Sequence, residues 1–313
     1  MAVESRGSVP GMTGEQDRRT IQQRSGALRL LRRYPLVGYF LIAYAVTWAY
    51  VLLFLVAFPL PDVLGRTVPG DLGPTVAALA MTAVLAGKPG LRRFLRRLVL
   101  WRVHPGWYAF IVLGVPALYL LGILLVPGAL ASFTAPSPAT VLLWPVLFLV
   151  VAVIGGPLFE EPGWRGFALP RLQARWGPLG GAVLLGLLWA GWHAPNYLRP
   201  DWAADNGGLN PRGVGVYALA VVSFSVIITW VFNHTRGSVL IAILLHTAIN
   251  ASQVLTAAVF PAAGTNEVGP LVVFGLTALV VVVATRGRLG YAPAGGEAEP
   301  VRVGTDAAER ALA

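Results

Sequence analysis

The stretch GPLFEEPGWRG at residues 156–166 places two adjacent carboxylates, Glu160 and Glu161, at the end of a strongly apolar run. Between Asp71 and Asp201 the chain has no other Asp or Glu. A carboxylate inside a bilayer or at its edge is costly, so two side by side need a partner or a chemical role.

Two histidines also lie in apolar stretches. His193 follows Trp189 by four residues and His246 precedes Asn250 by four, so each pair shares one face of a helix. A lone histidine of this kind is often only a hydrogen-bonding partner between helices. Together with the glutamates, however, these residues supply the parts of a hydrolytic site. A carboxylate can take a proton from water, imidazoles can bind a metal or position that water, and an amide can donate to a developing oxyanion.

Composition predicts that an all-α polytopic membrane protein positions these residues. The chain has 313 residues, of which 56% are hydrophobic and 12% charged, against roughly 25% charged residues in a soluble domain. Its long apolar runs approach or exceed the length of about 20 residues with which a helix spans a bilayer. We expect about eight transmembrane helices, at 34–60, 72–87, 107–127, 140–160, 178–194, 213–233, 237–258 and 268–285. Cysteine is absent, so a metal site would use His, carboxylate or amide ligands.

The basic residues predict the topology. The connections after the second, fourth, sixth and eighth spans contain arginines, whereas residues 59–70 hold one basic residue and residues 128–139 and 259–267 none. The positive-inside rule places the basic loops and both termini in the cytoplasm. Topology thus accounts for the net charge of +10, and no nucleic acid is expected as a partner. The LRRFLRRLVLW segment is either a topology anchor or a basic amphipathic segment in the membrane interface.

We therefore predict one transmembrane domain at residues 34–285, between two tails. Residues 1–33 are polar and basic, and residues 286–313 are rich in Gly, Ala and Glu. Both tails are expected to be disordered and cytoplasmic.

Three motifs in this order resemble the CPBP family, which comprises type II CAAX prenyl endopeptidases, bacteriocin-processing and immunity proteins, and Abi-type proteins. The motifs are EEPGWR from Glu160 to Arg165, WAGWH from Trp189 to His193, and HTAIN from His246 to Asn250. The resemblance covers about residues 140–260, and the family's architecture of eight spans agrees with the hydropathy.

The resemblance implies an intramembrane endopeptidase whose site opens toward the cytoplasm. Glu160 would be the general base that activates water, and His193 would help to hold that water or a metal. His246 and Asn250 would complete the ligand set or form the oxyanion hole. A set of His193, His246 and Glu160 suits Zn²⁺ with an open position, but the same residues also serve a metal-free mechanism, and the sequence leaves both open.

Glu161 and Arg165 would be supporting residues. In a helix they stand at i and i+4, which suits an ion pair that fixes the orientation of the glutamates. Pro162 between them predicts a kink or break at Glu161. The neighbouring Trp164, like Trp189, is interpreted mainly as a packing residue.

Glu160 and His193 can share one site only if they lie at a similar depth in the membrane. Hydropathy places Glu160 near the cytoplasmic end of the fourth span, whereas His193 lies about 15 residues, or roughly 22 Å of helix rise, into the fifth. We expect the helix to continue past Glu160, with PGWRGFALPRL extending inside the protein.

The predicted function is hydrolysis of a peptide bond in a membrane-associated protein or peptide by glutamate-activated water, in a multi-pass protein of the bacterial cytoplasmic membrane. Its partners are the bilayer and the peptide; whether the peptide is prenylated is left open. One alternative is a non-catalytic binding, immunity or assembly factor of the same family, although a binder need not keep four costly polar groups. Another is a small-solute transporter, whose internal repeats are not visible in this sequence.

Overall fold

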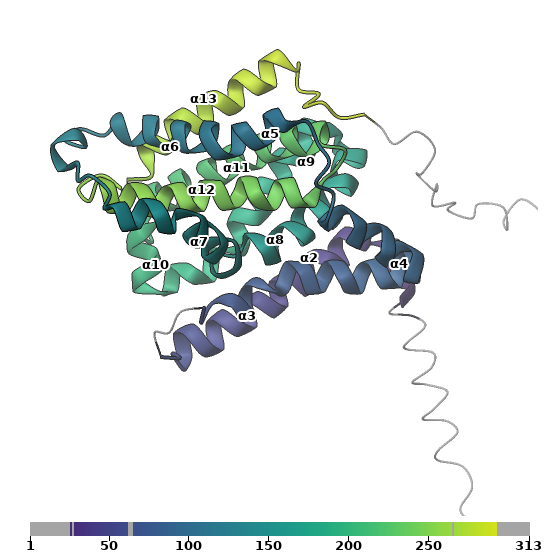
Figure 1. Ribbon diagram of the computed structural model, residues 1–313. Coiled ribbons are helices and arrows are strands. Elements are labelled where there is room, and N and C mark those ends of the chain that lie inside the picture. Colours follow the sequence, from purple (N-terminus) through teal and green to yellow (C-terminus); the bar gives the residue numbers. More distant parts are fainter. Residues whose placement is uncertain (1–25, 27, 62–64, 265, 293–313) are drawn as a thin grey trace, which may run out of the picture.

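The computed structural model describes residues 26–292 except 27, 62–64 and 265. The described residues form helices and no strand, and the helices pack side by side in one bundle (Figure 1). The all-α prediction is confirmed.

Each of the eight apolar stretches expected from the sequence is helical. The elements, with η for short 3-10 or π-helical segments, are α2 (Pro35–Tyr50), η1 (Val51–Ala57), α3 (Val68–Asp71), α4 (Gly73–Leu98), α5 (Pro105–Ala109), η2 (Phe110–Gly114), α6 (Val115–Leu124), η3 (Leu130–Ser132), α7 (Pro138–Ile154), α8 (Pro157–Gly163), η4 (Trp164–Ala168), α9 (Leu169–Trp192), η5 (Ala194–Leu198), α10 (Pro200–Asp205), α11 (Pro211–His234), α12 (Val239–Val259) and α13 (Val268–Ala284).

Several of these helices can cross a membrane. Five stretches of the described chain are long and apolar enough: Pro35–Ala57, Val68–Leu98, Pro105–Leu124, Pro211–His234 and Val239–Val259. Pro138–Ile154 and Pro157–Leu198, bent by 50° at the break between them, add a sixth if the pair is one broken span rather than a re-entrant loop, and Val268–Ala284 is an apolar helix of 17 residues. The chain is a polytopic membrane protein, and the full number of eight crossings stays a prediction.

The fourth expected span ends earlier than its hydropathy suggested. Helix α7 stops at Ile154, and Gly156 adopts φ 91°, a left-handed conformation that glycine reaches without steric cost. The prediction of a kink or break at Glu161 is therefore wrong, because the helix breaks at Gly155–Gly156 instead. Pro162 sits inside α8, and the π-helical turn η4 follows it. Such wider turns are a common adjustment within helices at functional sites.

A helical hairpin then brings the motifs together. Helix α9 is interrupted at Gly177 (φ 72°, ψ 169°), just before Pro178, and its second part packs back on its first, since a Cβ on Gly181 would lie 2.8 Å from the backbone nitrogen of Gln173. Glu160 precedes Gly177 by about as many residues as His193 follows it, so the reversal places both at a similar depth. As expected, PGWRGFALPRL continues as a helix inside the protein, and most of it is buried.

The loops that the sequence marks as basic meet at one end of the bundle. Arg97 donates to the carbonyls of Gly166 at 3.1 Å and Gly237 at 3.0 Å, and Asn233 donates to the carbonyl of Leu289 at 2.9 Å. In Figure 1 this end lies on the right, where α2 begins and α13 ends. We call it the arginine-rich end; it comprises residues 88–106, 166–177, 234–238 and 285–292.

The connections poor in basic residues meet at the opposite end. The backbone nitrogen of Thr134 donates to the carbonyl of Val259 at 2.8 Å. Asp201 pairs with Arg66 at 3.2 Å and with Arg199 at 2.6 Å, which compensates the basic charges there. The opposite end comprises residues 58–61, 65–72, 125–137, 194–210, 259–264 and 266–267. This sorting agrees with the alternation expected from the sequence, and the side that faces the cytoplasm stays a prediction.

The edges of the packed domain lie slightly outside residues 34–285. Residues 28–33 are helical and precede α2, and Leu289 after α13 has no exposed surface. Of the tails predicted to be disordered, residues 1–25 and 293–313 lie outside the described residues.

Candidate active site

A cavity of about 640 Å³ lies between α7, α9, α11 and α12. Four of the predicted site residues, Glu160, His193, His246 and Asn250, line it. Glu161 and Arg165 lie behind this wall, with no exposed side-chain surface. The structure thus brings all six predicted residues into one region, in two layers.

Glu160 is held at both carboxylate oxygens. Its Oε2 accepts from the indole nitrogen of Trp189 at 2.7 Å and from that of Trp164 at 3.4 Å. Its Oε1 lies against Gly156, where an added Cβ would come within 2.2 Å of it. The break between α7 and α8 therefore makes room for this carboxylate, which is 3% exposed.

Glu161 connects Arg165 to His246. Its Oε1 accepts from Arg165 Nη1 at 2.8 Å, so the predicted i,i+4 ion pair is present, and from His246 Nδ1 at 2.9 Å. Because a carboxylate oxygen in an ion pair only accepts hydrogen bonds, the proton of the neutral imidazole lies on Nδ1. His246 therefore keeps Nε2 for other contacts, and the carboxylate fixes its ring orientation.

His193 is fixed in the same way by a backbone group. Its Nδ1 lies 3.0 Å from the carbonyl oxygen of Trp189, which only accepts, so Nδ1 donates and Nε2 is left for other contacts. The ring packs edge-on against Trp192 at 4.6 Å between centroids and is stacked with Trp202 at 6.0 Å. Both cavity histidines thus carry an oriented imidazole.

Asn250 ties α12 to the helix break. Its Nδ2 donates to the carbonyl oxygen of Gly155 at 3.1 Å, at the residue that ends α7. One N–H of the amide is thereby engaged. A role of Asn250 as oxyanion donor or ligand stays a prediction.

Residues 142–252, which contain all three motifs, match the family described as "Type II CAAX prenyl endopeptidase Rce1-like". A "CAAX prenyl protease 2" of Methanococcus maripaludis is 29% identical over 206 residues, which cover 60% of this chain and 71% of that protein. Both matches support a resemblance of the stretch with the three motifs to the CPBP family. Because this relative is archaeal, a bacterial origin stays a prediction.

A metal in this cavity would have to bind at atoms that the hydrogen bonds described above leave unused. Among the described residues, no group of three His, Asp or Glu side chains is placed to hold a metal ion. The Oε2 of Glu160 accepts from two indoles and Nδ1 of each cavity histidine is engaged, so Nε2 of the two rings and Oε1 of Glu160 are the atoms that would hold a metal. We therefore derive no step through zinc, and its binding by His193, His246 and Glu160 stays a prediction.

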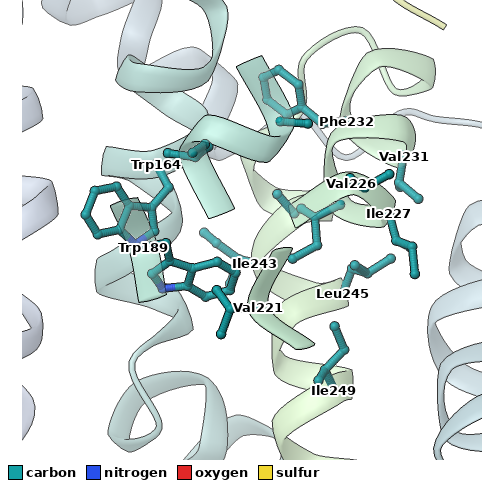
Figure 2. Close-up of a cluster of buried hydrophobic side chains, with 14 of the residues drawn as sticks. Trp164, Trp189, Val221, Val226, Ile227, Val231, Phe232, Ile243, Leu245 and Ile249 are labelled. Carbon is teal, nitrogen blue, oxygen red and sulfur yellow. The ribbon is translucent and has the colours of Figure 1, made fainter. Parts of the chain in front are cut away.

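The interpretation of two CPBP-motif tryptophans as packing residues missed their polar contacts. Figure 2 shows Trp164 and Trp189 at one edge of a cluster of buried apolar side chains, so both do pack there. Their indole nitrogens, however, point to Glu160. The available signal was spacing, since Trp164 follows Glu160 by four residues and a buried indole N–H needs an acceptor.

Proposed function

We propose that the protein is an intramembrane endopeptidase in which Glu160 activates the water that attacks a peptide bond. The observation that carries the proposal is that Glu160, His193 and His246 converge on one cavity, each with a defined orientation. The similarity to type II CAAX prenyl endopeptidases supports a protease.

Glu160 is the group that moves the proton. Its carboxylate takes a proton from water while the water oxygen forms a bond to the carbonyl carbon of the peptide. The same proton then passes to the amide nitrogen as the C–N bond breaks, which yields a carboxylic acid and an amine; proton transfer between them gives the carboxylate and the ammonium group. The indoles of Trp164 and Trp189 keep the carboxylate in one orientation during both transfers.

The two imidazoles act on the attacking water and on the oxyanion. With Nδ1 donating to Glu161 or to the carbonyl of Trp189, a neutral ring presents Nε2 as the acceptor for the water hydrogen that Glu160 does not take. A protonated ring would instead donate from Nε2 to the oxyanion. The buried Glu161–Arg165 pair holds His246 for this task, because fixed dipoles in a water-poor site need no reorganisation.

The cavity walls indicate the substrate class. Leu147, Val150 and Val151 of α7 and Val221 and Phe224 of α11 line the space beside the polar residues. The peptide is therefore apolar near the cleaved bond and belongs to a membrane-associated protein or peptide. Whether the peptide is prenylated is a separate question, which a comparison of the cleavage of prenylated and unmodified peptides would answer.

The test is cleavage by the full chain purified in detergent. A library of internally quenched peptides would be incubated with wild type and with Glu160→Gln, which keeps the size of the side chain but removes the base. We expect a decrease of at least about a thousandfold, as for loss of a general base with its positioned water. Gel filtration and thermal unfolding would establish that Glu160→Gln is folded.

Zinc content would be measured on the same samples by elemental analysis. Stoichiometric zinc that is lost in His193→Gln and His246→Gln would establish the metal set predicted from the sequence. Cleavage that persists in Glu160→Gln would contradict the proposal. If no peptide were cleaved and Glu160→Gln still supported the host phenotype, a non-catalytic binding or immunity factor would be favoured.

A further inference from the structure

The part of α4 that follows Gly87 carries cations without counterions. Lys88, Arg92 and Arg96 follow one another at intervals of four residues, and all three are exposed. Like charges at this spacing share one face of a helix and destabilise it. Within the described part of the chain, no carboxylate forms an ion pair with any of the three. The charge on this face therefore calls for an anionic partner from outside the described chain.

Large apolar side chains lie between these cations. Leu95 is 50% exposed and Val99 68% exposed. A shallow hollow of about 530 Å³ is lined by Lys88, Leu91, Arg92, Leu95, Arg96 and Val99, which we call the basic face of α4. Just beyond it, Trp101 is 60% exposed, with the Arg102 guanidinium over its ring at 5.1 Å. Cations, exposed apolar groups and a tryptophan together are typical of the boundary between lipid headgroups and acyl chains.

The basic face begins where the apolar part of α4 ends. Residues 73–87 hold no charged side chain, and the helix is interrupted at Gly87 (φ 55°, ψ −153°), two residues before Pro89. The stretch Val68–Leu98 has 31 residues, about ten more than a helix needs to span a bilayer. The charged end is this surplus, so it lies at the surface of the bilayer. Figure 1 shows α4 at the edge of the bundle beside α2.

The inner side of the same segment is fixed to the protein. Phe94 is 5% exposed and covers Gly166 of η4, where an added Cβ would lie 2.8 Å from its ring. Arg97 donates to the carbonyls of Arg165 at 3.3 Å and Gly166 at 3.1 Å, and to that of Gly237, just before α12, at 3.0 Å. The basic face is thus held in place by η4 and by the start of α12. A rigidly presented surface has little backbone entropy to lose when a ligand binds.

We propose that the basic face of α4 binds the headgroups of anionic phospholipids. Lys88, Arg92 and Arg96 would pair with the lipid phosphates, while Leu95 and Val99 would contact the first methylene groups of the acyl chains. A topology anchor alone needs the positive charges but not their alignment on one face with apolar side chains between them. The inference does not depend on the proposed peptidase activity, because binding needs no turnover.

The test is lipid binding by the full chain in detergent micelles. The protein would be titrated with dioleoyl phosphatidylglycerol or with dioleoyl phosphatidylcholine, and bound lipid would be counted by native mass spectrometry. The double variant Arg92→Gln/Arg96→Gln removes two cations of the basic face and keeps good helix formers. The matched control is Arg286→Gln/Arg288→Gln, which removes the same charge from exposed residues at the same end of the bundle.

We expect phosphatidylglycerol to bind wild type more tightly than phosphatidylcholine does. The affinity of Arg92→Gln/Arg96→Gln for phosphatidylglycerol should fall by about twenty- to thirtyfold, from about fivefold for each basic residue near an anionic surface. The control variant should lose less than about fivefold. Bound phosphatidylglycerol should also raise the unfolding temperature of wild type, since a ligand of the folded state stabilises it, and the Arg92→Gln/Arg96→Gln variant should lack this rise.

Three results would overturn the proposal. Equal affinities of wild type for the two lipids would show that the headgroup charge is not recognised. An equal loss of affinity in the two double variants would show that any pair of basic residues at this end serves as well. Inorganic phosphate that raised the unfolding temperature as much as phosphatidylglycerol at the same concentration would make a free anion the ligand. Both double variants keep every residue of the candidate active site, so none of these results depends on whether Glu160→Gln abolishes cleavage.

Discussion

Trp189 donates from its indole nitrogen to Oε2 of Glu160 at 2.7 Å and so joins the two arms of the helical hairpin at the level of the cavity. The same indole packs edge-on against His246 at 4.9 Å, and the Arg165 guanidinium lies over it at 4.7 Å. One side chain thus contacts the proposed base, an imidazole and the buried cation, and its indole nitrogen donates to the base.

Replacing this indole separates its hydrogen bond from its packing. Trp189→Phe keeps an aromatic ring against His246 and removes the donor. A hydrogen bond to a charged group contributes about 1.5–3 kcal/mol, so we expect kcat to fall by about ten- to a hundredfold with KM little changed. The measurement is cleavage by purified protein. Trp164→Phe is the matched control, and its effect should be smaller because its contact with Glu160 is 3.4 Å.

The buried ion pair behind the cavity leads to a prediction about stability. Glu161→Gln would leave Arg165 charged and wholly buried without its counterion. Breaking a buried pair on one side costs about 3–5 kcal/mol, so thermal unfolding in detergent should occur at a clearly lower temperature. Asp201→Asn is the control, since Asp201 is 53% exposed and such surface pairs contribute about 0–1 kcal/mol. Equal unfolding temperatures for both variants would show that the buried pair has no such role.

The sequence allowed the site to be predicted better than the path of the chain through it. Motif spacing identified the residues that meet, because costly polar groups in an apolar segment have few reasons to be there. It also correctly predicted that the helix continues into the protein beyond Glu160. The predicted position of the break was wrong. Hydropathy carries no information about backbone conformation, and the prediction rested on Pro162 rather than on the preceding Gly155–Gly156 pair.

The polar roles of Trp164 and Trp189 were missed for a different reason. An indole is mostly apolar, so a tryptophan in an apolar helix reads as packing until an acceptor is located in space. The acceptor of Trp189 lies on the other arm of the hairpin, and that contact depends on the reversal at Gly177.

Two glycines with positive φ allow backbone strain to be separated from contact with the base. A Cβ at Gly156 (φ 91°) would collide with Glu160 Oε1 at 2.2 Å, whereas at Gly177 (φ 72°) it would meet nothing within 4 Å. We expect both Gly156→Ala and Gly177→Ala to lose stability, on the order of 1–3 kcal/mol from backbone strain, and Gly156→Ala to lose more because of the collision with Glu160. Only Gly156→Ala should lose most of its cleavage activity, by about a hundredfold or more, since the base is displaced. Comparable activities in the two variants would argue against a role of this turn in positioning Glu160.

Glu267 stands where the cavity meets the loop before α13. Its Oε1 accepts from Gln253 Nε2 at 3.0 Å, and it lines the cavity together with Asp205. Burial, and to a lesser degree the charge of Asp205, raise the pKa of Glu267 to about 7 from an ordinary value of 4.5. The folded protein therefore holds a proton at this carboxyl that the unfolded chain releases in mildly acidic solution.

The stability of the folded state should decrease as pH rises between 4.5 and about 7, because over this window the folded state binds more protons than the unfolded chain at Glu267. One pKa unit corresponds to about 1.4 kcal/mol, so the loss from this carboxyl is on the order of 1–3 kcal/mol. Glu267→Gln, which is neutral at every pH and keeps an acceptor for Gln253, should lack this part of the decrease. Thermal unfolding in detergent at pH 5, 6, 7 and 8 would measure it for both proteins. Parallel curves for wild type and Glu267→Gln would mean that Glu267 ionises as freely in the folded protein as in the unfolded chain.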